Sequence, residues 1–86
     1  MAPYEIQFKT SAAKEFRKLP IEIKTRLQKA MNALQIEPRP PGMKKLAGED
    51  DLYRIRVGDY RVIYKIDDAV LLITVMRIRH RREVYQ

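Results

Sequence analysis

Three arginines in the middle of the chain have the spacing expected of an anion-binding site. Arg54 and Arg56 alternate with apolar residues, and Arg61 follows five positions later. Successive side chains of a β-strand point to opposite faces, so Arg54 and Arg56 are expected on one face, opposite their apolar neighbours. Guanidinium groups present planar sets of N–H donors that match a phosphate, which makes phosphate binding the chemistry that these residues suggest.

The pair Gly58-Asp59 predicts how these arginines meet. With glycine first, it suits a type II′ turn between strands at 52–57 and 60–66. Arg56 then lies directly opposite Arg61, a like-charge pairing that destabilises a sheet by roughly a few tenths of a kcal/mol or more. An anion between the two guanidinium groups is the economical explanation. The alternative is that the two side chains splay apart into water.

The C-terminal run adds Arg79 and Arg81, which alternate with His80. A two-residue turn at Asp67-Asp68 would place His80 on the face of Arg61. One extra residue, or a β-bulge, would place Arg79 and Arg81 there instead. The sequence leaves both registers open.

His80 and Tyr85 each allow two interpretations. His80, the only histidine, is either an ordinary surface residue or a proton shuttle acting near neutral pH. Tyr85 either docks its ring on the sheet or stacks on a base. The sequence has no P-loop, no dinucleotide fingerprint and no nucleophile–histidine–carboxylate arrangement, and His80 has no evident metal-binding partners. No metal or cofactor is therefore expected.

Composition limits the class of protein. The 86 residues are enough for a single domain, residues 1–86, and they carry a formal net charge of +7, which favours phosphate backbones or an acidic protein as partners. Simple solubility is the alternative explanation of the charge. The absence of cysteine fits a reducing cytosol, no signal peptide is apparent, and the longest apolar run is far short of the ~20 residues that span a bilayer. A soluble cytoplasmic protein without membrane contact is expected.

Hydrophobic periodicity predicts the elements that position these residues. Thr10 and Ser11 offer a hydroxyl N-cap to a first helix. Pro20 suits the first position of a second helix, and Pro38 disfavours helical geometry at Glu37. The expected elements are a strand at 4–8, helices ending at Leu19 and running from Pro20 to Glu37, a stiff connector at 37–42, brief pairing at 44–46, a turn at 48–51, strands at 52–57 and 60–66, a turn at 67–68 and a strand from Val70 to about Ile78.

This order predicts an α+β fold of the form β-α-α-β-β-β. The last three strands would form an antiparallel meander, with the two N-terminal helices packed on one face of a small antiparallel sheet. The other face, which would carry the arginines, stays open to a ligand. An apolar stripe of helical period in the second helix would face the sheet: Ile23, Leu27, Ala30, Met31 and Leu34.

Four stretches of the chain together resemble the RelE branch of the RelE/ParE toxin superfamily. The resemblance covers nearly the whole chain, and its most specific part is the block Tyr-Arg-Ile-Arg-Val-Gly-Asp-Tyr-Arg-Val-Ile-Tyr. The matching stretches are Phe8 to Pro20, Lys45 to Gly48, Leu52 to Tyr64 and His80 to Tyr85.

The resemblance implies a toxin of a type II toxin–antitoxin system. Such a toxin is a ribosome-dependent endoribonuclease that cuts mRNA in the ribosomal A site and is neutralised by a short antitoxin, expected here to be acidic. It also implies roles for the residues. Arg54 and Arg56 fall at paired basic strand positions, Arg61 at a phosphate-stabilising arginine, Arg81 at a basic residue associated with the leaving group, and Tyr85 at a tyrosine near the substrate.

The family usually has lysines where this chain has Arg54 and Arg56. Arginine is effectively always protonated, so the general-base role proposed for a strand lysine in the family transfers poorly to Arg54 and Arg56. Cleavage without a metal remains feasible, because RNA supplies its own 2′-hydroxyl nucleophile. Two alternatives stay open: a ParE-like toxin that binds gyrase and cuts no RNA, and a non-catalytic RNA- or protein-binding module of the same fold.

Overall fold

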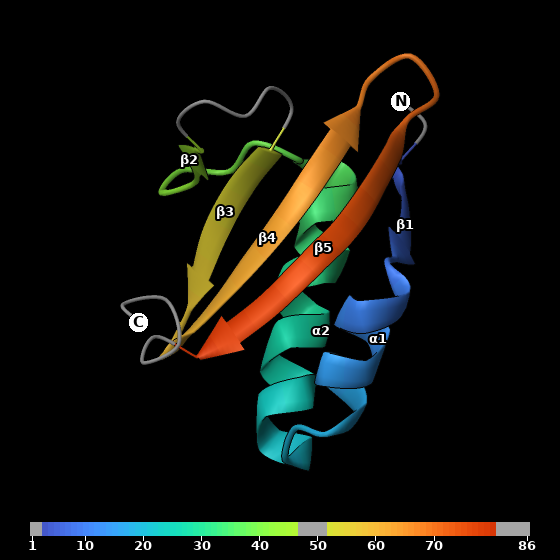
Figure 1. Ribbon diagram of the computed structural model, residues 1–86. Coiled ribbons are helices and arrows are strands. Elements are labelled where there is room, and N and C mark those ends of the chain that lie inside the picture. The colour runs from blue at the N-terminus through green and yellow to red at the C-terminus, as the bar shows by residue number, and fades with distance from the viewer. Residues whose placement is uncertain (1–2, 47–51, 81–86) are drawn as a thin grey trace.

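The computed structural model describes residues 3–46 and 52–80, and it has the predicted α+β architecture (Figure 1). Its elements are β1 (Glu5–Phe8), α1 (Thr10–Arg17), α2 (Ile21–Ile36), β2 (Lys44–Lys45), β3 (Leu52–Val57), β4 (Tyr60–Asp67) and β5 (Leu72–His80). The five strands form one sheet in the order β1-β5-β4-β3-β2. Neighbouring strands from β2 to β5 are antiparallel, but β1 pairs with β5 in parallel, so the sheet is mixed rather than wholly antiparallel.

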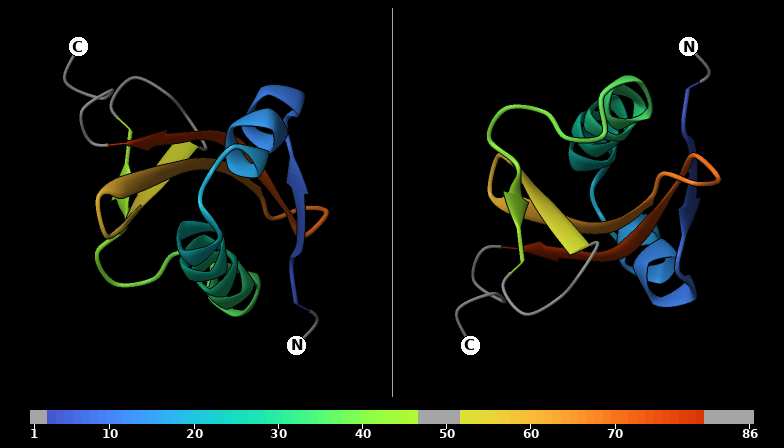
Figure 2. Two further views of the ribbon diagram at one scale, coloured as in Figure 1. Left: turned by 90° about the horizontal axis from the view of Figure 1, so that it is seen from below. Right: turned by 90° about the horizontal axis from the view of Figure 1, so that it is seen from above.

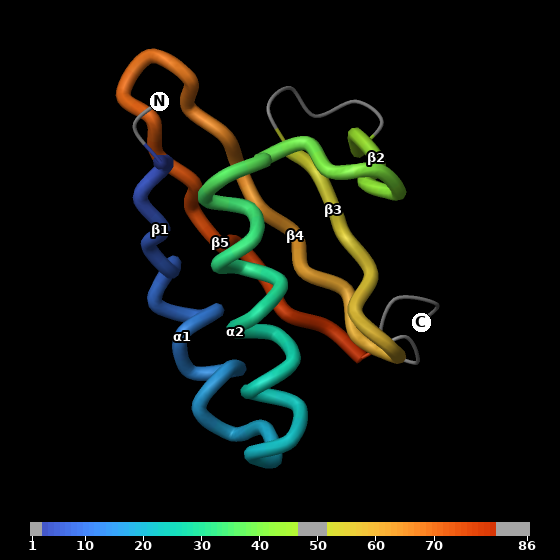
Figure 3. Tube along the Cα trace, turned by 180° about the vertical axis from the view of Figure 1, so that it is seen from behind, coloured from blue at the N-terminus to red at the C-terminus, as the bar shows by residue number. Residues whose placement is uncertain are grey.

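The helix α2 lies across one face of the sheet, behind it in Figure 1 and in front of it in Figure 3. The predicted apolar stripe is confirmed, with Leu27, Met31 and Leu34 fully buried. The helix ends at Ile36, and Glu37 before Pro38 is extended, with φ −133° and ψ 93°, as a residue preceding proline prefers. Pro20 lies at the N-cap, one position before the helix proper.

The helix α1 continues from β1 and lies against β5 (Figure 2). The predicted hydroxyl cap is wrong: Lys9 is at the N-cap position, and no side chain caps the helix. The reason is that Lys9 still belongs to the edge of the sheet, where its amide donates to the carbonyl of Val75 at 2.9 Å. No helix among residues 3–46 and 52–80 is long and apolar enough to cross a membrane.

A polar network holds the connector after α2 against one end of the sheet. The Tyr64 hydroxyl donates to the carbonyl of Pro38 at 2.8 Å, and Arg39 forms a 2.9 Å ion pair with Asp68. The Tyr4 hydroxyl also donates to Asp68, at 2.6 Å. Arg39, and after it Tyr4, hold the pKa of the Asp68 carboxyl below its ordinary value of 3.8. The connector therefore reaches β2 along a fixed path.

The β4–β5 connection differs from the prediction. β4 runs through Asp67, and the turn comprises the four residues 68–71 instead of Asp67-Asp68 alone. Leu71 closes the turn with a left-handed φ of 54°. Further along, Tyr64 pairs with Val75 but Ile63 pairs with Arg77, so Met76 forms a β-bulge.

Candidate phosphate-binding site on the open face

Arg56 and Arg61 are direct cross-strand partners. The predicted register is confirmed, since Val57 pairs with Tyr60 and Arg56 with Arg61. Gly58 has φ 61°, and no non-glycine residue of the hairpin has positive φ, as a type II′ turn requires. Arg56 Nε donates to the carbonyl of Gly58 at 3.3 Å, which ties its guanidinium to the turn.

A shallow cavity of about 300 Å³ joins these two arginines to other basic side chains. It is lined by Gly42, Lys44, Arg54, Arg56 and Arg61, and none of these described lining residues is acidic. Lys44 pairs with Arg54, which explains how β2 brings it onto the same face. Within the described part of the chain, the side chains of Lys44 and Arg54 make no hydrogen bond or ion pair.

Lys44 was missed as a site residue by the sequence reasoning. The signal was present, because brief pairing was expected at residues 44–46 next to the arginine strand. What the sequence did not show is that the connector is pinned at Pro38 and Arg39. This attachment fixes where Gly42 and Lys44 enter the cavity.

The bulge at Met76 decides which C-terminal side chain faces Arg61. Without it, β5 would keep the register set by the pairing of Tyr64 with Val75, and His80 would share the face of Arg61. With it, Arg79 pairs with Arg61, so the second of the two registers left open above is the one observed. A row of three arginines, Arg56, Arg61 and Arg79, therefore crosses β3, β4 and β5 on the open face.

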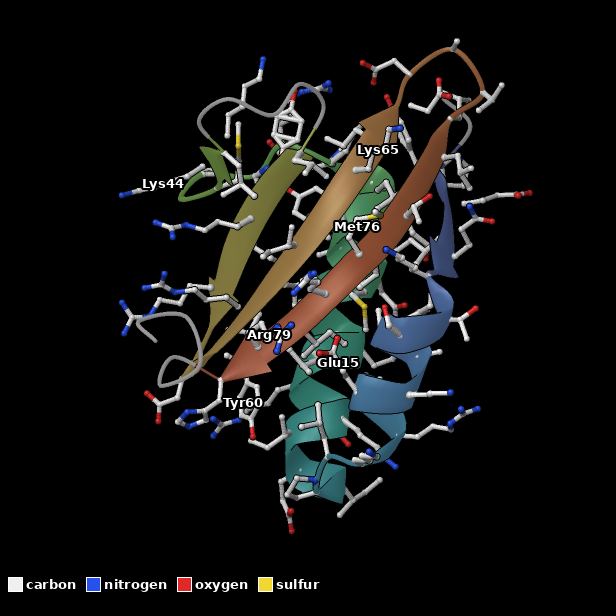
Figure 4. The ribbon with its side chains drawn as sticks, in the orientation of Figure 1. Glu15, Lys44, Tyr60, Lys65, Met76 and Arg79 are labelled. Carbon is white, nitrogen blue, oxygen red and sulfur yellow. The ribbon has the colours of Figure 1, made fainter. Side chains whose placement is uncertain are left out.

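Glu15 of α1 meets this row at its outer end. Its Oε1 accepts a 3.1 Å hydrogen bond from the Ile78 amide, and its Oε2 lies 3.7 Å from Arg79 Nε. Figure 4 shows the labelled Glu15 and Arg79 side by side at the edge of β5. Glu15 could not be recognised as a site residue from the sequence, because a lone carboxylate on a helix gives no signal of its distant partner.

His80 lies elsewhere. It pairs with Tyr60, and the two rings make an edge-to-face contact with centroids 5.1 Å apart. It lines a second cavity, of about 340 Å³, on the side of the hairpin that meets Ile23 and Arg26 of α2. The structure thus brings Arg54, Arg56 and Arg61 together but does not bring His80 into their cavity.

Arg81 and Tyr85 lie outside the residues that the structure describes. Their assigned places, near the leaving group and near the substrate, stay predictions. The last described residue, His80, ends β5 beside the hairpin that carries Arg56 and Arg61.

The chemistry of this face is that of an anion site. Four cationic side chains from three strands surround one cavity, and a phosphate bound there would relieve the opposition of Arg56 and Arg61 while accepting several charge-assisted hydrogen bonds. Arg56 and Arg54 have fixed positive charge and cannot act as bases. The arginines are therefore suited to binding and polarising a phosphodiester rather than to removing a proton.

Comparison with known proteins identifies one family for this chain. A family model described as the ParE toxin of the type II toxin–antitoxin system parDE matches residues 6–85. Toxin RelG of Mycobacterium tuberculosis is 33% identical over 88 residues, covering 98% of each chain. The mRNA interferase toxin RelE of Escherichia coli is 33% identical over 86 residues, covering 95% of this chain and 90% of that protein.

The solved structures agree with this. In the archaeal RelE–RelB complex from Pyrococcus horikoshii, the matching chain superposes with a TM-score of 0.82 at 31% identity, covering 92% of this chain and 96% of that one. The relatives carry the names RelG and RelE, whereas the matching family model carries the name ParE, as expected for two branches of one superfamily. The chain belongs to the RelE branch of the RelE/ParE superfamily of type II toxin–antitoxin toxins.

Proposed function

We propose that this protein is a ribosome-dependent endoribonuclease that cuts mRNA in the ribosomal A site and so inhibits translation. The observation that carries the proposal is the cavity in which Arg54, Arg56 and Arg61 gather with Lys44 on an open sheet face. One relative at 33% identity is named an mRNA interferase, which supports the same chemistry. Action on translating ribosomes would place the protein in the cytoplasm.

The proposed reaction uses the nucleophile already present in RNA. The 2′-hydroxyl attacks the adjacent phosphorus, the bond to the leaving 5′-oxygen breaks, and the products are a 2′,3′-cyclic phosphate and a 5′-hydroxyl. Positioning of the attacking and leaving oxygens in line can supply up to roughly 7–11 kcal/mol of the barrier. Preorganised cations add stabilisation of the charge that develops on the phosphorane. No metal is required in this scheme.

Each basic residue has a proposed part. Arg56 and Arg61 bind the scissile phosphate from adjacent strands, and Arg54 assists. Arg81 would stabilise the leaving oxygen, and Arg79, which pairs with Arg61, is a second candidate for that role. Tyr85 would orient a base. His80 remains a candidate proton shuttle that would have to act from the neighbouring cavity.

The ribosome would complete the site. The described cavity is lined by arginines, a lysine and a glycine, and offers no carboxylate or imidazole to take the 2′-hydroxyl proton. The free protein should therefore cut naked RNA poorly, and a strained mRNA conformation imposed by the ribosome would supply the missing alignment. A cognate antitoxin, acidic at least where it binds the toxin, would neutralise the basic face. The Pyrococcus horikoshii structure is a RelE–RelB complex, and a matching Mycobacterium tuberculosis structure is the toxin–antitoxin complex RelBE2.

A brief expression experiment separates this activity from gyrase inhibition, the alternative suggested by the family model described as ParE. The expected result is in-frame cleavage of translated messages, mapped by primer extension, with unchanged plasmid supercoiling. Supercoiling defects with intact messages would instead establish the gyrase inhibitor, and intact messages with normal supercoiling would favour a non-catalytic module. Cleavage of mRNA on purified ribosomes should persist after chelation of divalent metals, provided that the ribosomes stay intact.

A further inference from the structure

We infer that Glu15 is a positioning residue for the proposed cleavage, and that its carboxylate orients Arg79 for the phosphate held by Arg56 and Arg61. The inference rests on the proposed function and extends it to a helix that the sequence analysis did not connect with the site. Glu15 itself would touch neither the RNA nor the reacting atoms.

The first support is that one carboxylate serves two consecutive residues of β5. Oε1 accepts from the Ile78 amide at 3.1 Å, and Oε2 lies 3.7 Å from Arg79 Nε. β1 ends at Phe8, and its pairing with β5 ends at Val75, so no strand among residues 3–46 and 52–80 pairs with this edge of β5 beyond that point. Glu15 supplies the acceptor that the edge amide needs, and this bond fixes the second oxygen beside Arg79.

The second support is that α1 holds Glu15 firmly. Ala12, one turn earlier on the helix, is fully buried in the core. Phe16, the next residue, packs on Phe8 with ring centroids 5.5 Å apart. The Glu15 side chain is 28% exposed and that of Arg79 34%, so both are more enclosed than Arg39 and Asp68, which are 40% and 57% exposed. A restrained carboxylate can hold an arginine in one orientation.

The third support is the position of this pair in the row of arginines. Arg79 is the cross-strand partner of Arg61, which is the partner of Arg56. Three adjacent positive charges repel one another, and the Glu15 carboxylate offsets part of that repulsion at Arg79. The contact is made at Arg79 Nε, the guanidinium nitrogen nearest the strand, so Glu15 restrains the guanidinium group at the end where it joins the side chain. Arg56 and Arg61, which line the basic cavity, are the members of the row proposed to bind the substrate phosphate.

The test compares Glu15→Gln with the wild type in single-turnover cleavage of mRNA on purified ribosomes. Glutamine keeps an oxygen for the Ile78 amide but removes the charge that orients Arg79. The cleavage rate at saturating toxin should fall about tenfold, with little change in the toxin concentration that gives half the maximal rate, because misplacement of a catalytic group by about 1 Å costs up to 10²-fold. Glu22→Gln, an exposed carboxylate on α2, serves as the matched control and should cut like the wild type.

The decisive arm repeats Glu15→Gln in an Arg79→Ala background. A positioning role predicts that the substitution then has no further effect on the residual rate. An equal loss in both backgrounds, or a wild-type or faster rate for Glu15→Gln alone, would overturn the inference. Thermal melting identifies unfolded variants, and Glu15→Ala, which also removes the bond to Ile78, should be the less stable of the two Glu15 variants.

Failure of the inference and failure of the proposed function give different results. A wild-type protein that cuts no ribosome-bound mRNA would overturn both. A wild-type protein that cuts, and that loses cleavage on Arg61→Ala but not on Glu15→Gln, would retain the function and overturn the role of Glu15.

Discussion

Tyr64 at the buried centre of β4 donates a 2.8 Å hydrogen bond to the carbonyl of Pro38, just beyond the end of α2. The side chain of Tyr64 is fully buried, so the bond joins the core to the connector that leads to Gly42 and Lys44. A tyrosine in the middle of the sheet thus helps to place one wall of the basic cavity.

Replacement of Tyr64 by phenylalanine tests this link. The free energy of unfolding should fall by about 0.5–1.5 kcal/mol at neutral pH, since the ring is kept and one hydrogen bond is lost. Burial raises the pKa of Tyr64 from 10.0 to about 12, so the protonated form stabilises the fold. That contribution is complete below pH 10 and is lost as the pH rises towards 12. Chemical denaturation at neutral and alkaline pH measures the free energy of unfolding, which should fall less at alkaline pH for Tyr64→Phe than for the wild type. An equal fall in both proteins would contradict the stabilising role of the protonated Tyr64 hydroxyl.

Asp68→Asn should destabilise the protein at neutral pH by removing the 2.9 Å ion pair with Arg39. Because the pKa of Asp68 lies below 3.8 in the folded protein, the contribution of its charge is present above that pH and is lost on acidification through the lowered pKa. The melting temperatures of wild type and Asp68→Asn should therefore converge in acid. Asp67→Asn is the control, because Asp67 Oδ1 accepts a hydrogen bond from the Ala69 amide but forms no ion pair with the described residues, so its effect on the melting temperature at neutral pH should be smaller. A gap in melting temperature that persists unchanged well below pH 3.8 would contradict the prediction.

Gly58→Ala should destabilise the hairpin that sets Arg56 against Arg61. The φ of 61° at Gly58 is left-handed, and alanine there costs roughly 1–2 kcal/mol. An added Cβ would meet only Arg26 Nη1, at an ordinary 3.7 Å, so the cost is conformational rather than steric. In urea denaturation, the free energy of unfolding should fall less for Gly58→Asn than for Gly58→Ala, since asparagine adopts positive φ more readily than alanine. Equal stability of all three proteins would show that the turn does not depend on this backbone geometry.

The parts of the site that the sequence predicted are those set by neighbouring residues. Strand alternation and the glycine-first turn act within ten residues, and they were enough to pair Arg56 with Arg61. Pro38 likewise ended α2 by a local steric effect on Glu37.

The parts that could not be predicted depend on contacts between distant segments. The side of Arg79 depends on a bulge at Met76, and the direction of β1 depends on its pairing with the last strand. The local rule for a hydroxyl cap failed at Thr10 because the sheet already engages Lys9. Glu15 reaches Ile78 across 63 positions, a separation that no periodicity reports.

Arg56 and Arg61, cross-strand partners in the basic cavity, are proposed to hold one phosphodiester between them. The direct measurement is the single-turnover rate of mRNA cleavage on ribosomes for Arg56→Ala, Arg61→Ala and the double variant. Lys65→Ala is the control, because this exposed β4 residue lies outside the described cavity lining (Figure 4). Each single substitution should lower the rate by about 10²–10³-fold, and the double should lose less than the product of the two, because both groups act on the same phosphate. An undiminished rate for a folded Arg61→Ala protein would contradict the account.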